Sequence, residues 1–266
     1  MSKEKTPGVL VVLATLGQRP DLLRQTLTSI TKQRIKNVDV VLVYPFKDKV
    51  TTKLASEFHT KTIDDPGSMC AAVNAGIKSA KPKHKYITWI GDDDLLAPDS
   101  LKTTISALEN NDDAVAAFGY CDYINDTDKR LLTSKAGSLA PWLMTWGPNL
   151  IPLPGSLFRS SVLLAMDQPF DESLKYAMDL DLFLRLRKIG RLINTHTVVL
   201  AFRWHASSTT VANRDKSLSE ARLVKRRYMS PVQKFFAPLW EKPVYIATKI
   251  AANRVNSIAI RHADGD

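Results

Sequence analysis

The chain has 266 residues, of which 44% are hydrophobic and 24% are charged. These proportions are ordinary for a soluble globular protein and exclude collagen-like, disulfide-rich and wholly disordered chains. The formal net charge is +10, and ten Lys and Arg residues against four acidic residues after position 215 contribute +6 of it. A nucleic-acid-binding module spreads basic and aromatic residues over one folded surface, so this concentration at one end argues against nucleic acid as a partner.

Cysteine usage and the first residues predict the cellular compartment. Cys70 and Cys121 stand in no spacing typical of a zinc site or of a disulfide framework. The first apolar run, residues 9–13, is too short for the core of a signal peptide. We therefore expect a cytoplasmic protein, and the basic C-terminal part leaves the inner face of the membrane open as its place there.

Apolar periodicity divides the chain into alternating strands and helices. Continuous apolar runs predict buried strands, and apolar residues at helical spacing predict the helices between them. The expected strands are 9–13, 38–43, 86–90 and 198–202, and the expected helices are 23–30, 67–80 and one through Leu108 with Pro98 in its first turn. This alternation is typical of an α/β domain with a mostly parallel central sheet flanked by helices.

The longest stretch without a charged residue covers positions 136–158, a length that could cross a bilayer. Four prolines and three glycines in it argue against a continuous helix. We expect a long loop inside the domain, carrying Trp142 and Trp146.

Three adjacent aspartates, Asp92, Asp93 and Asp94, follow the strand predicted at 86–90. Ligands of open α/β sheets bind at the carboxyl ends of the strands, where this cluster would lie. Such a cluster can also cap a helix or form a turn, but Pro98 begins the next helix several residues later, so a cap needs at most one aspartate. Hard oxygen ligands at this point suit Mg²⁺ or Mn²⁺ shared with a substrate phosphate.

Five stretches, taken together and in this order, resemble the motifs of the family-2 glycosyltransferases. They read ATLGQRP at 14–20, AAVNAGI at 71–77, IGDDDLLAP at 90–98, FDESL at 170–174 leading to MDLDL at 178–182, and RWH at 203–205. The resemblance implies a single GT-A-type domain over residues 1–215, with residues 216–266 as a basic, amphipathic helical extension.

The same resemblance implies an inverting transferase that takes a hexose or deoxyhexose from a nucleotide-sugar donor, with Mg²⁺ or Mn²⁺ as cofactor. The metal neutralises the charge that develops on the leaving diphosphate, and an aspartate deprotonates the acceptor hydroxyl. The implied residues are Asp92, Asp93, Asp94 and His205 for the metal, Thr15, Arg19, Asp65, Asn74, Asp92, Asp93 and Arg203 for the donor, and Asp179 as the general base.

Simpler roles stay open for four of these residues. Asp179 can be a carboxylate that a helix N-terminus stabilises, and Asp65 can belong to an acidic turn before a helix. Arg203 can pack beside its aromatic neighbour, and a lone histidine such as His205 is often structural.

The sequence departs from the family pattern at several points. Met178 replaces the glutamate that usually precedes the base, Tyr44 and Pro45 replace the aspartate that reads the nucleobase, and Val73 replaces an arginine. The nucleobase is therefore left open, and so is an inactive relative that binds sugars or nucleotides. A nucleotidyltransferase is a further alternative, although residues 17–20 make a poor phosphate loop.

The remaining expectations concern the acceptor and the C-terminal extension. Aromatic faces suit sugar rings, so Trp142 and Trp146 are predicted contacts of a saccharide or lipid-linked acceptor, with core packing as the alternative. Asp181 is predicted to form a solvated salt bridge with Arg185. The extension is predicted either to contact an anionic membrane or to pack on the domain or on a second subunit of a homo-oligomer.

Overall fold

The computed structural model describes residues 7–204 and 213–263. Helices and strands alternate regularly through its first half. These elements are β1 (Gly8–Ala14), α1 (Pro20–Thr31), β2 (Val38–Tyr44), α2 (Lys49–Glu57), β3 (Lys61–Asp64), α3 (Met69–Lys78) and β4 (His84–Ile90). The expected β-α-β organisation is confirmed.

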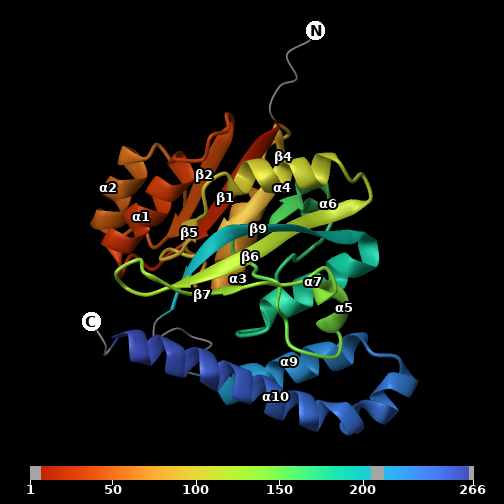
Figure 1. The fold of residues 1–266 in the computed structure, drawn as a ribbon. Coiled ribbons are helices and arrows are strands. Elements are labelled where there is room, and N and C mark those ends of the chain that lie inside the picture. Colours follow the sequence, from red (N-terminus) through yellow and green to blue (C-terminus); the bar gives the residue numbers. More distant parts are fainter. Residues whose placement is uncertain (1–6, 205–212, 264–266) are drawn as a thin grey trace.

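The second half adds longer strands and further helices. They are β5 (Leu95–Leu96), α4 (Ser100–Glu109), β6 (Ala114–Ile124), β7 (Arg130–Ser134), α5 (Ala140–Leu143), β8 (Leu157–Arg159), α6 (Ser160–Leu164), α7 (Met178–Ile189), β9 (Arg191–Arg203), α9 (Arg214–Tyr228) and α10 (Pro231–Ala263). Across the described residues the strands form one nine-stranded sheet in the order β3-β2-β1-β4-β8-β6-β9-β5, with β7 beside β6 (Figure 1).

The sheet is mixed. Strands β1 to β4 pair in parallel, as predicted, and β6 pairs in parallel with β9. Strand β8 joins these two parts through antiparallel ladders with β4 and β6. The carboxyl ends of β1 and β4 therefore lie side by side, which brings the segments that follow Ala14 and Ile90 together.

Helices cover both faces of the sheet, and this explains why β1 is buried along its whole length. Leu10 and Val12 belong to one core cluster, together with residues of α3 and α7. Val9, Val11 and Leu13 belong to a second cluster, with residues of α1 and α4. Alternate side chains of a strand point to opposite faces, so an apolar run of this kind fits two covered faces.

Helices α3 and α4 begin later than the sequence prediction. Helix α3 begins later than expected, at Met69, because the Ser68 hydroxyl accepts the N–H of Ala71 and caps it. Helix α4 begins at Ser100, so Pro98 lies outside it rather than in its first turn. Between them Asp99 adopts a left-handed conformation with φ of 57°.

Residues 136–158 form the predicted loop, interrupted by the single turn of α5 and ending in β8. Within the ranges that the structure describes, no helix is long and apolar enough to cross a membrane. Helices α9 and α10 form the predicted C-terminal extension and lie together beneath α5 and α7 (Figure 1). Val224 and Ala237 are buried there, so the extension packs on the domain.

Candidate active site

The loop after β1 and the loop after β4 meet through one arginine and two carboxylates. Arg19 donates from Nη2 to Oδ1 of Asp92 at 2.6 Å and from Nη1 to Oδ2 of Asp93. Thr15 Oγ1 donates to the other oxygen of Asp92 at 2.5 Å. Burial raises the pKa of Asp92, while the bonds from Thr15 and Arg19 oppose that shift. These bonds bring together four of the predicted donor-binding residues: Thr15, Arg19, Asp92 and Asp93.

Asp94 is separated from this pair although it follows directly in sequence. It is only 2% exposed, and its Oδ1 accepts the backbone N–H of Arg203 at 3.1 Å. Burial and the neighbouring Asp93 raise the pKa of Asp94 well above its usual range. Its backbone carbonyl accepts the hydroxyl of Thr26 at 2.7 Å. Asp94 thus joins the loop to both β9 and α1.

Arg203 also supports this loop, and its contacts leave its predicted role in donor binding untested. It is 1% exposed, and four of its N–H groups are used by protein oxygens. Nε donates to the carbonyl of Asp93 at 3.1 Å, and the other three bonds reach the Asn125 carbonyl, Gln25 and Asp128. The guanidinium holds the aspartate loop in place.

The arrangement of Asp92 and Asp93 fits a cation. Their carboxylates already converge on the positively charged guanidinium of Arg19, which occupies the place where a divalent ion would bind. In the described part of the chain, no three His, Cys, Asp or Glu side chains form a metal cluster. His205 lies outside the described residues. The protein therefore offers two carboxylates here, and a diphosphate would have to supply further oxygen ligands.

Asp179 lies in the first turn of α7, a half-buried position at the edge of the charge-free loop. Its Oδ2 accepts the side-chain amide of Asn149 at 2.9 Å, and its Oδ1 accepts the N–H of Leu180 at 2.7 Å. Burial raises the pKa of Asp179, and these two bonds oppose the shift because they stabilise the charged form. A raised pKa makes the ionised carboxylate a stronger base than an ordinary aspartate.

A carboxylate of the C-terminal extension holds the start of α7. Glu220 of α9 accepts the backbone N–H groups of Lys175, Tyr176 and Ala177, the last at 2.7 Å. These residues lie directly before the helix, where N–H groups lack partners within it. The negative charge of Glu220 also contributes to the raised pKa of Asp179.

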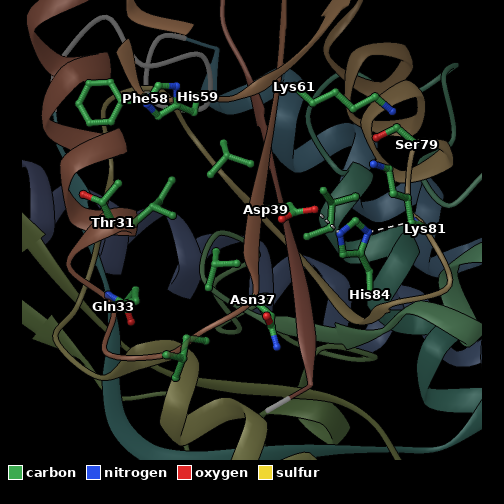
Figure 2. Close-up of a pocket in the computed structure, with 15 residues that line it drawn as sticks. Thr31, Gln33, Asn37, Asp39, Phe58, His59, Lys61, Ser79, Lys81 and His84 are labelled. Atoms are coloured by element: carbon green, nitrogen blue, oxygen red, sulfur yellow. Dashed lines mark hydrogen bonds and ion pairs between the residues drawn. The ribbon is translucent and has the colours of Figure 1, made fainter. Parts of the chain in front are cut away.

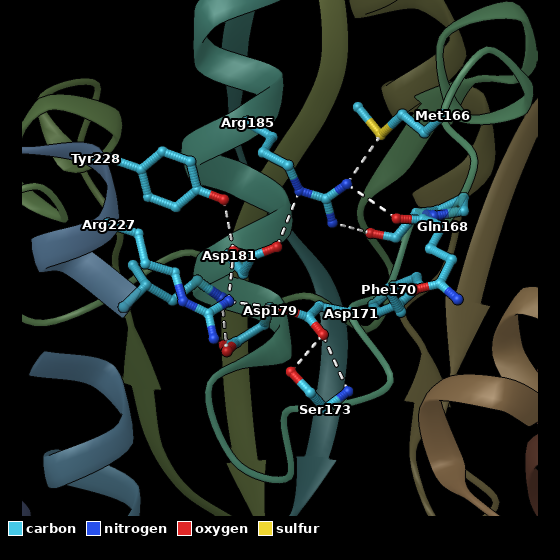
Figure 3. A network of polar contacts seen from close by, with 12 residues as sticks. Met166, Gln168, Phe170, Asp171, Ser173, Asp179, Asp181, Arg185, Arg227 and Tyr228 are labelled. Carbon is cyan, nitrogen blue, oxygen red and sulfur yellow. Dashed lines mark hydrogen bonds and ion pairs between the residues drawn. The ribbon is translucent and has the colours of Figure 1, made fainter. Parts of the chain in front are cut away.

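Asp181 is buried, and its predicted solvated salt bridge is wrong in this respect. The bond from Arg185 Nε to Asp181 Oδ2 is present at 2.9 Å, but Asp181 is 2% exposed. Figure 3 shows Asp181 between Arg185 and Tyr228, whose hydroxyl donates to Asp181 at 2.6 Å. Arg227 lies nearby on Asp171. The prediction missed this because Tyr228 and Arg227 come from α9, far along the chain.

A cavity of about 310 Å³ opens beside Asp179. Residues of the charge-free loop, of the start of α7 and of both C-terminal helices line it. Trp146 and Trp240 contact each other edge to face there, with ring centroids 5.1 Å apart. The indole nitrogen of Trp240 is buried with no hydrogen-bond partner among the described residues. Trp142 is 56% exposed and is not among the described residues that line this cavity.

Asn74 and Asp65 each have structural partners. The Asn74 side chain is 2% exposed and forms hydrogen bonds in both directions with the backbone of Phe170, at 2.8 and 2.9 Å. It thereby holds the segment that leads into α7. The Asp65 carboxylate accepts the N–H of Gly67 at 3.0 Å. This bond forms the acidic turn before a helix that was predicted as the simpler role of Asp65. Neither contact tests the predicted role in donor binding.

A larger cavity, of about 490 Å³, lies at the opposite edge of the sheet, by the amino ends of β1, β2 and β4 (Figure 2). His84 is buried there, and its Nε2 lies 2.9 Å from Oδ2 of Asp39. Its Nδ1 accepts the backbone N–H of Lys81 at 2.9 Å. The ring proton is therefore on Nε2, which donates a hydrogen bond to Asp39. This pair joins the amino ends of β2 and β4, away from the edge where α/β sheets bind ligands.

The sequence model of glycosyl transferase family 2 matches residues 11–159, more than half of the chain. The chain belongs to glycosyl transferase family 2. Uncharacterized glycosyltransferases of Rickettsia prowazekii and Rickettsia typhi are similar to it, with 29% and 28% identity over 204 and 225 residues. These matches cover 71% and 78% of this chain, which spans 61% and 68% of the two relatives.

Solved structures confirm the GT-A-type fold of this family-2 chain. TarS of S. aureus in complex with UDP-GlcNAc superposes with a TM-score of 0.62 at 14% identity, covering 82% of this chain and 65% of TarS. The complex of TarS with UDP gives a TM-score of 0.63 at 14% identity, covering 83% and 65%. At this identity the likeness concerns the fold.

Three residues around Asp179 of this family-2 chain were missed by sequence reasoning. Asn149 lies in the charge-free loop, Glu220 in α9 and Trp240 in α10. Each reaches the site through a long-range contact, and no local pattern marks it. The signal that was available is compositional: Asn149 is a polar side chain in a loop otherwise rich in apolar residues and prolines.

Proposed function

We propose that this chain transfers a sugar from a nucleotide-sugar donor to the hydroxyl of a saccharide or lipid-linked acceptor, with inversion at the anomeric carbon. The observation that carries the proposal is the position of Asp179: a carboxylate with a raised pKa, hydrogen-bonded by Asn149, at the wall of a cavity with two tryptophans. Family membership supports the same reaction class.

The donor binds, in this proposal, at the carboxyl ends of β1 and β4. TarS, whose fold this chain shares, binds UDP and UDP-GlcNAc, which supports a nucleotide sugar as the donor class. Asp92 and Asp93 would hold Mg²⁺ or Mn²⁺ against the diphosphate, and the ion would neutralise charge on the leaving group. Arg19, displaced from the carboxylates, would then face the phosphates, because its guanidinium can bind either anion in the same fork geometry.

Asp179 acts as the general base. It takes the proton from the acceptor hydroxyl as that oxygen forms its bond to the anomeric carbon. The bond from the anomeric carbon to the diphosphate oxygen breaks on the opposite face, and the nucleoside diphosphate leaves with the electron pair. One displacement of this kind inverts the anomeric configuration.

The acceptor would occupy the cavity between Asp179 and the C-terminal helices. Trp146 and Trp240 present aromatic surface to it, which suits the apolar face of a pyranose ring. Trp146 is therefore kept as a predicted acceptor contact, Trp240 is added, and Trp142 would have to contact acceptor portions outside the cavity.

Release of nucleoside diphosphate tests the proposal. The chain is incubated with UDP-, GDP- and dTDP-sugars and Mn²⁺, with a mixture of methyl pyranosides as acceptors, and Asp179→Asn serves as the matched variant. We expect diphosphate release from one donor, dependent on the acceptor and lost in the variant. Donor binding without release would instead identify an inactive sugar- or nucleotide-binding relative. In a parallel incubation with nucleoside triphosphates, release of pyrophosphate would identify a nucleotidyltransferase.

A further inference from the structure

Helix α10 is apolar on two opposite sides. Its inner side packs on the domain through buried Ala237 and lines the Asp179 cavity with Trp240 and Val244. Its outer side carries exposed apolar side chains whose spacing places them on one face of a helix. They are Val232, Phe235, Phe236, Leu239, Ile246 and Ile250, and we call them the outer face. A helix that is apolar all round is ordinarily covered all round.

The outer face is strongly exposed for its composition. Phe235 is 78% and Leu239 is 72% exposed. Single exposed apolar residues are common on soluble proteins, but a continuous row of them marks a surface that binds a membrane or another protein.

The charges around the outer face are positive. Lys242 is exposed beside it, one turn beyond Leu239, and Lys234 is exposed elsewhere on the same helix. Glu241 is the one acidic residue in the sequence of α10, and its side chain is turned inward, 13% exposed, and bound by Arg222 and Arg226 of α9. Among the described residues of α10 the exposed charged side chains are therefore Lys234 and Lys242, and the exposed carboxylate of Asp215 on α9 pairs with Lys249 farther along the helix.

We infer that the outer face of α10 binds the surface of an anionic lipid bilayer. Phe235, Phe236 and Leu239 enter the boundary between headgroups and acyl chains, as in interfacial helices of this composition. Lys242 lies along the bilayer surface and binds lipid phosphates through its ammonium group, and Lys234 adds positive charge to the same helix.

The charge pattern favours a bilayer over a second copy of the chain. A two-fold dimer through the outer face would place the same patch on both subunits. Lys242 of each copy would then lie at the interface, and the outer face itself carries no acidic side chain to pair it. Lysines are accordingly depleted from the cores of protein interfaces, whereas an anionic membrane supplies the missing negative charge.

Binding of the outer face to a bilayer would also set the distance between the Asp179 cavity and the membrane. Since α10 carries the outer face on one side and a wall of the Asp179 cavity on the other, membrane binding places the cavity one helix diameter, about 10 Å, from the lipid headgroups. An acceptor anchored in the bilayer would reach it from there. Membrane binding itself does not depend on the proposed sugar transfer.

Vesicle flotation with the full-length protein tests the inference. The vesicles contain equal parts of phosphatidylglycerol and phosphatidylcholine, or phosphatidylcholine alone. The test variant is Phe235→Asp with Leu239→Asp. The matched control is Leu164→Asp on α6, which also places an acid on an exposed apolar position, 48% exposed in this case. Circular dichroism and the melting temperature of each variant check that it is folded.

We expect the wild-type chain and the control to float with the anionic vesicles and the double variant to partition at least roughly tenfold less, because two large apolar side chains no longer leave water. Lys234→Glu with Lys242→Glu should lose binding to anionic vesicles. Equal partitioning of wild type and the Phe235/Leu239 variant overturns the inference. So does a wild-type dimer that this variant converts to monomer, since a second copy would then cover the outer face.

Discussion

The side-chain amide of Asn149 donates a hydrogen bond to Oδ2 of Asp179 over 2.9 Å. The two residues come from the charge-free loop and from the first turn of α7, so this bond fixes the loop against the proposed base. It also stabilises the ionised carboxylate, which burial disfavours.

Replacing Asn149 by alanine should raise the pKa of Asp179 further. The substitution removes a hydrogen-bond donor that stabilises the ionised carboxylate more than the neutral acid. The base must be ionised, so the acidic limb of the pH profile of kcat/KM should move to higher pH. The measurement is the profile for diphosphate release by wild type and Asn149→Ala. An unchanged limb together with reduced kcat at every pH would assign Asn149 a purely steric role.

Glu220→Gln should shift the same limb in the opposite direction. Glu220 raises the pKa of Asp179 through its negative charge, and glutamine removes that charge while its amide oxygen can still accept the N–H groups of residues 175–177. The pH profile of Glu220→Gln, compared with that of Glu241→Gln in the neighbouring helix, checks this. A limb at higher pH in Glu220→Gln would contradict the assignment.

Substitutions of Asp179 and Asp181 should have different effects, although the two residues lie two positions apart: the first should reduce catalysis and the second should reduce stability. Asp179→Asn should lower kcat by about 10²–10⁴, as expected when a general base is lost, with little change in the melting temperature. Asp181→Ala should lower the free energy of unfolding by about 3 kcal/mol, because it breaks a buried ion pair with Arg185 and leaves the Tyr228 hydroxyl without its acceptor. Denaturant titration and steady-state kinetics on both variants measure the two effects.

Arg203 should matter for stability in the same way. Arg203→Met removes four hydrogen bonds from a side chain that is 1% exposed, and we expect a loss of about 3–5 kcal/mol in the free energy of unfolding. Arg191→Met provides the control, because its ion pair with Asp113 is exposed and should contribute under about 1 kcal/mol. Urea unfolding of the two variants distinguishes them, and equal losses would show that Arg203 does not hold the aspartate loop.

Strands β1, β2 and β4 could be predicted because their signal is local: each contains a run of apolar residues. Strand β3, Lys61–Asp64, pairs in parallel with β2 but is mostly exposed and has no apolar run, so it was missed. Strand β9 was predicted only at its apolar end, 198–202, whereas it extends from Arg191 to Arg203. The polar residues 194–197 hid its first part, which β6 holds in the sheet by backbone pairing.

The residue types of the candidate site could be predicted from the sequence. Which partner each aspartate binds could not. The motif at 92–94 marks the carboxyl end of β4, but the sequence treats three adjacent aspartates alike. In the fold Arg19 selects Asp92 and Asp93, while Arg203 takes Asp94 through a backbone bond from β9. Such choices depend on which strands become neighbours, and periodicity does not determine that.

The most direct test of the account is a thermal-shift titration with UDP-, GDP- and dTDP-sugars, each with and without Mn²⁺, on wild type and on Asp92→Ala with Asp93→Ala. We predict that one nucleotide sugar raises the melting temperature, that Mn²⁺ enlarges the shift, and that the double variant loses it while Asp179→Asn keeps it. No shift with any donor, or an equal shift in the double variant, would contradict a nucleotide-sugar site at Asp92 and Asp93.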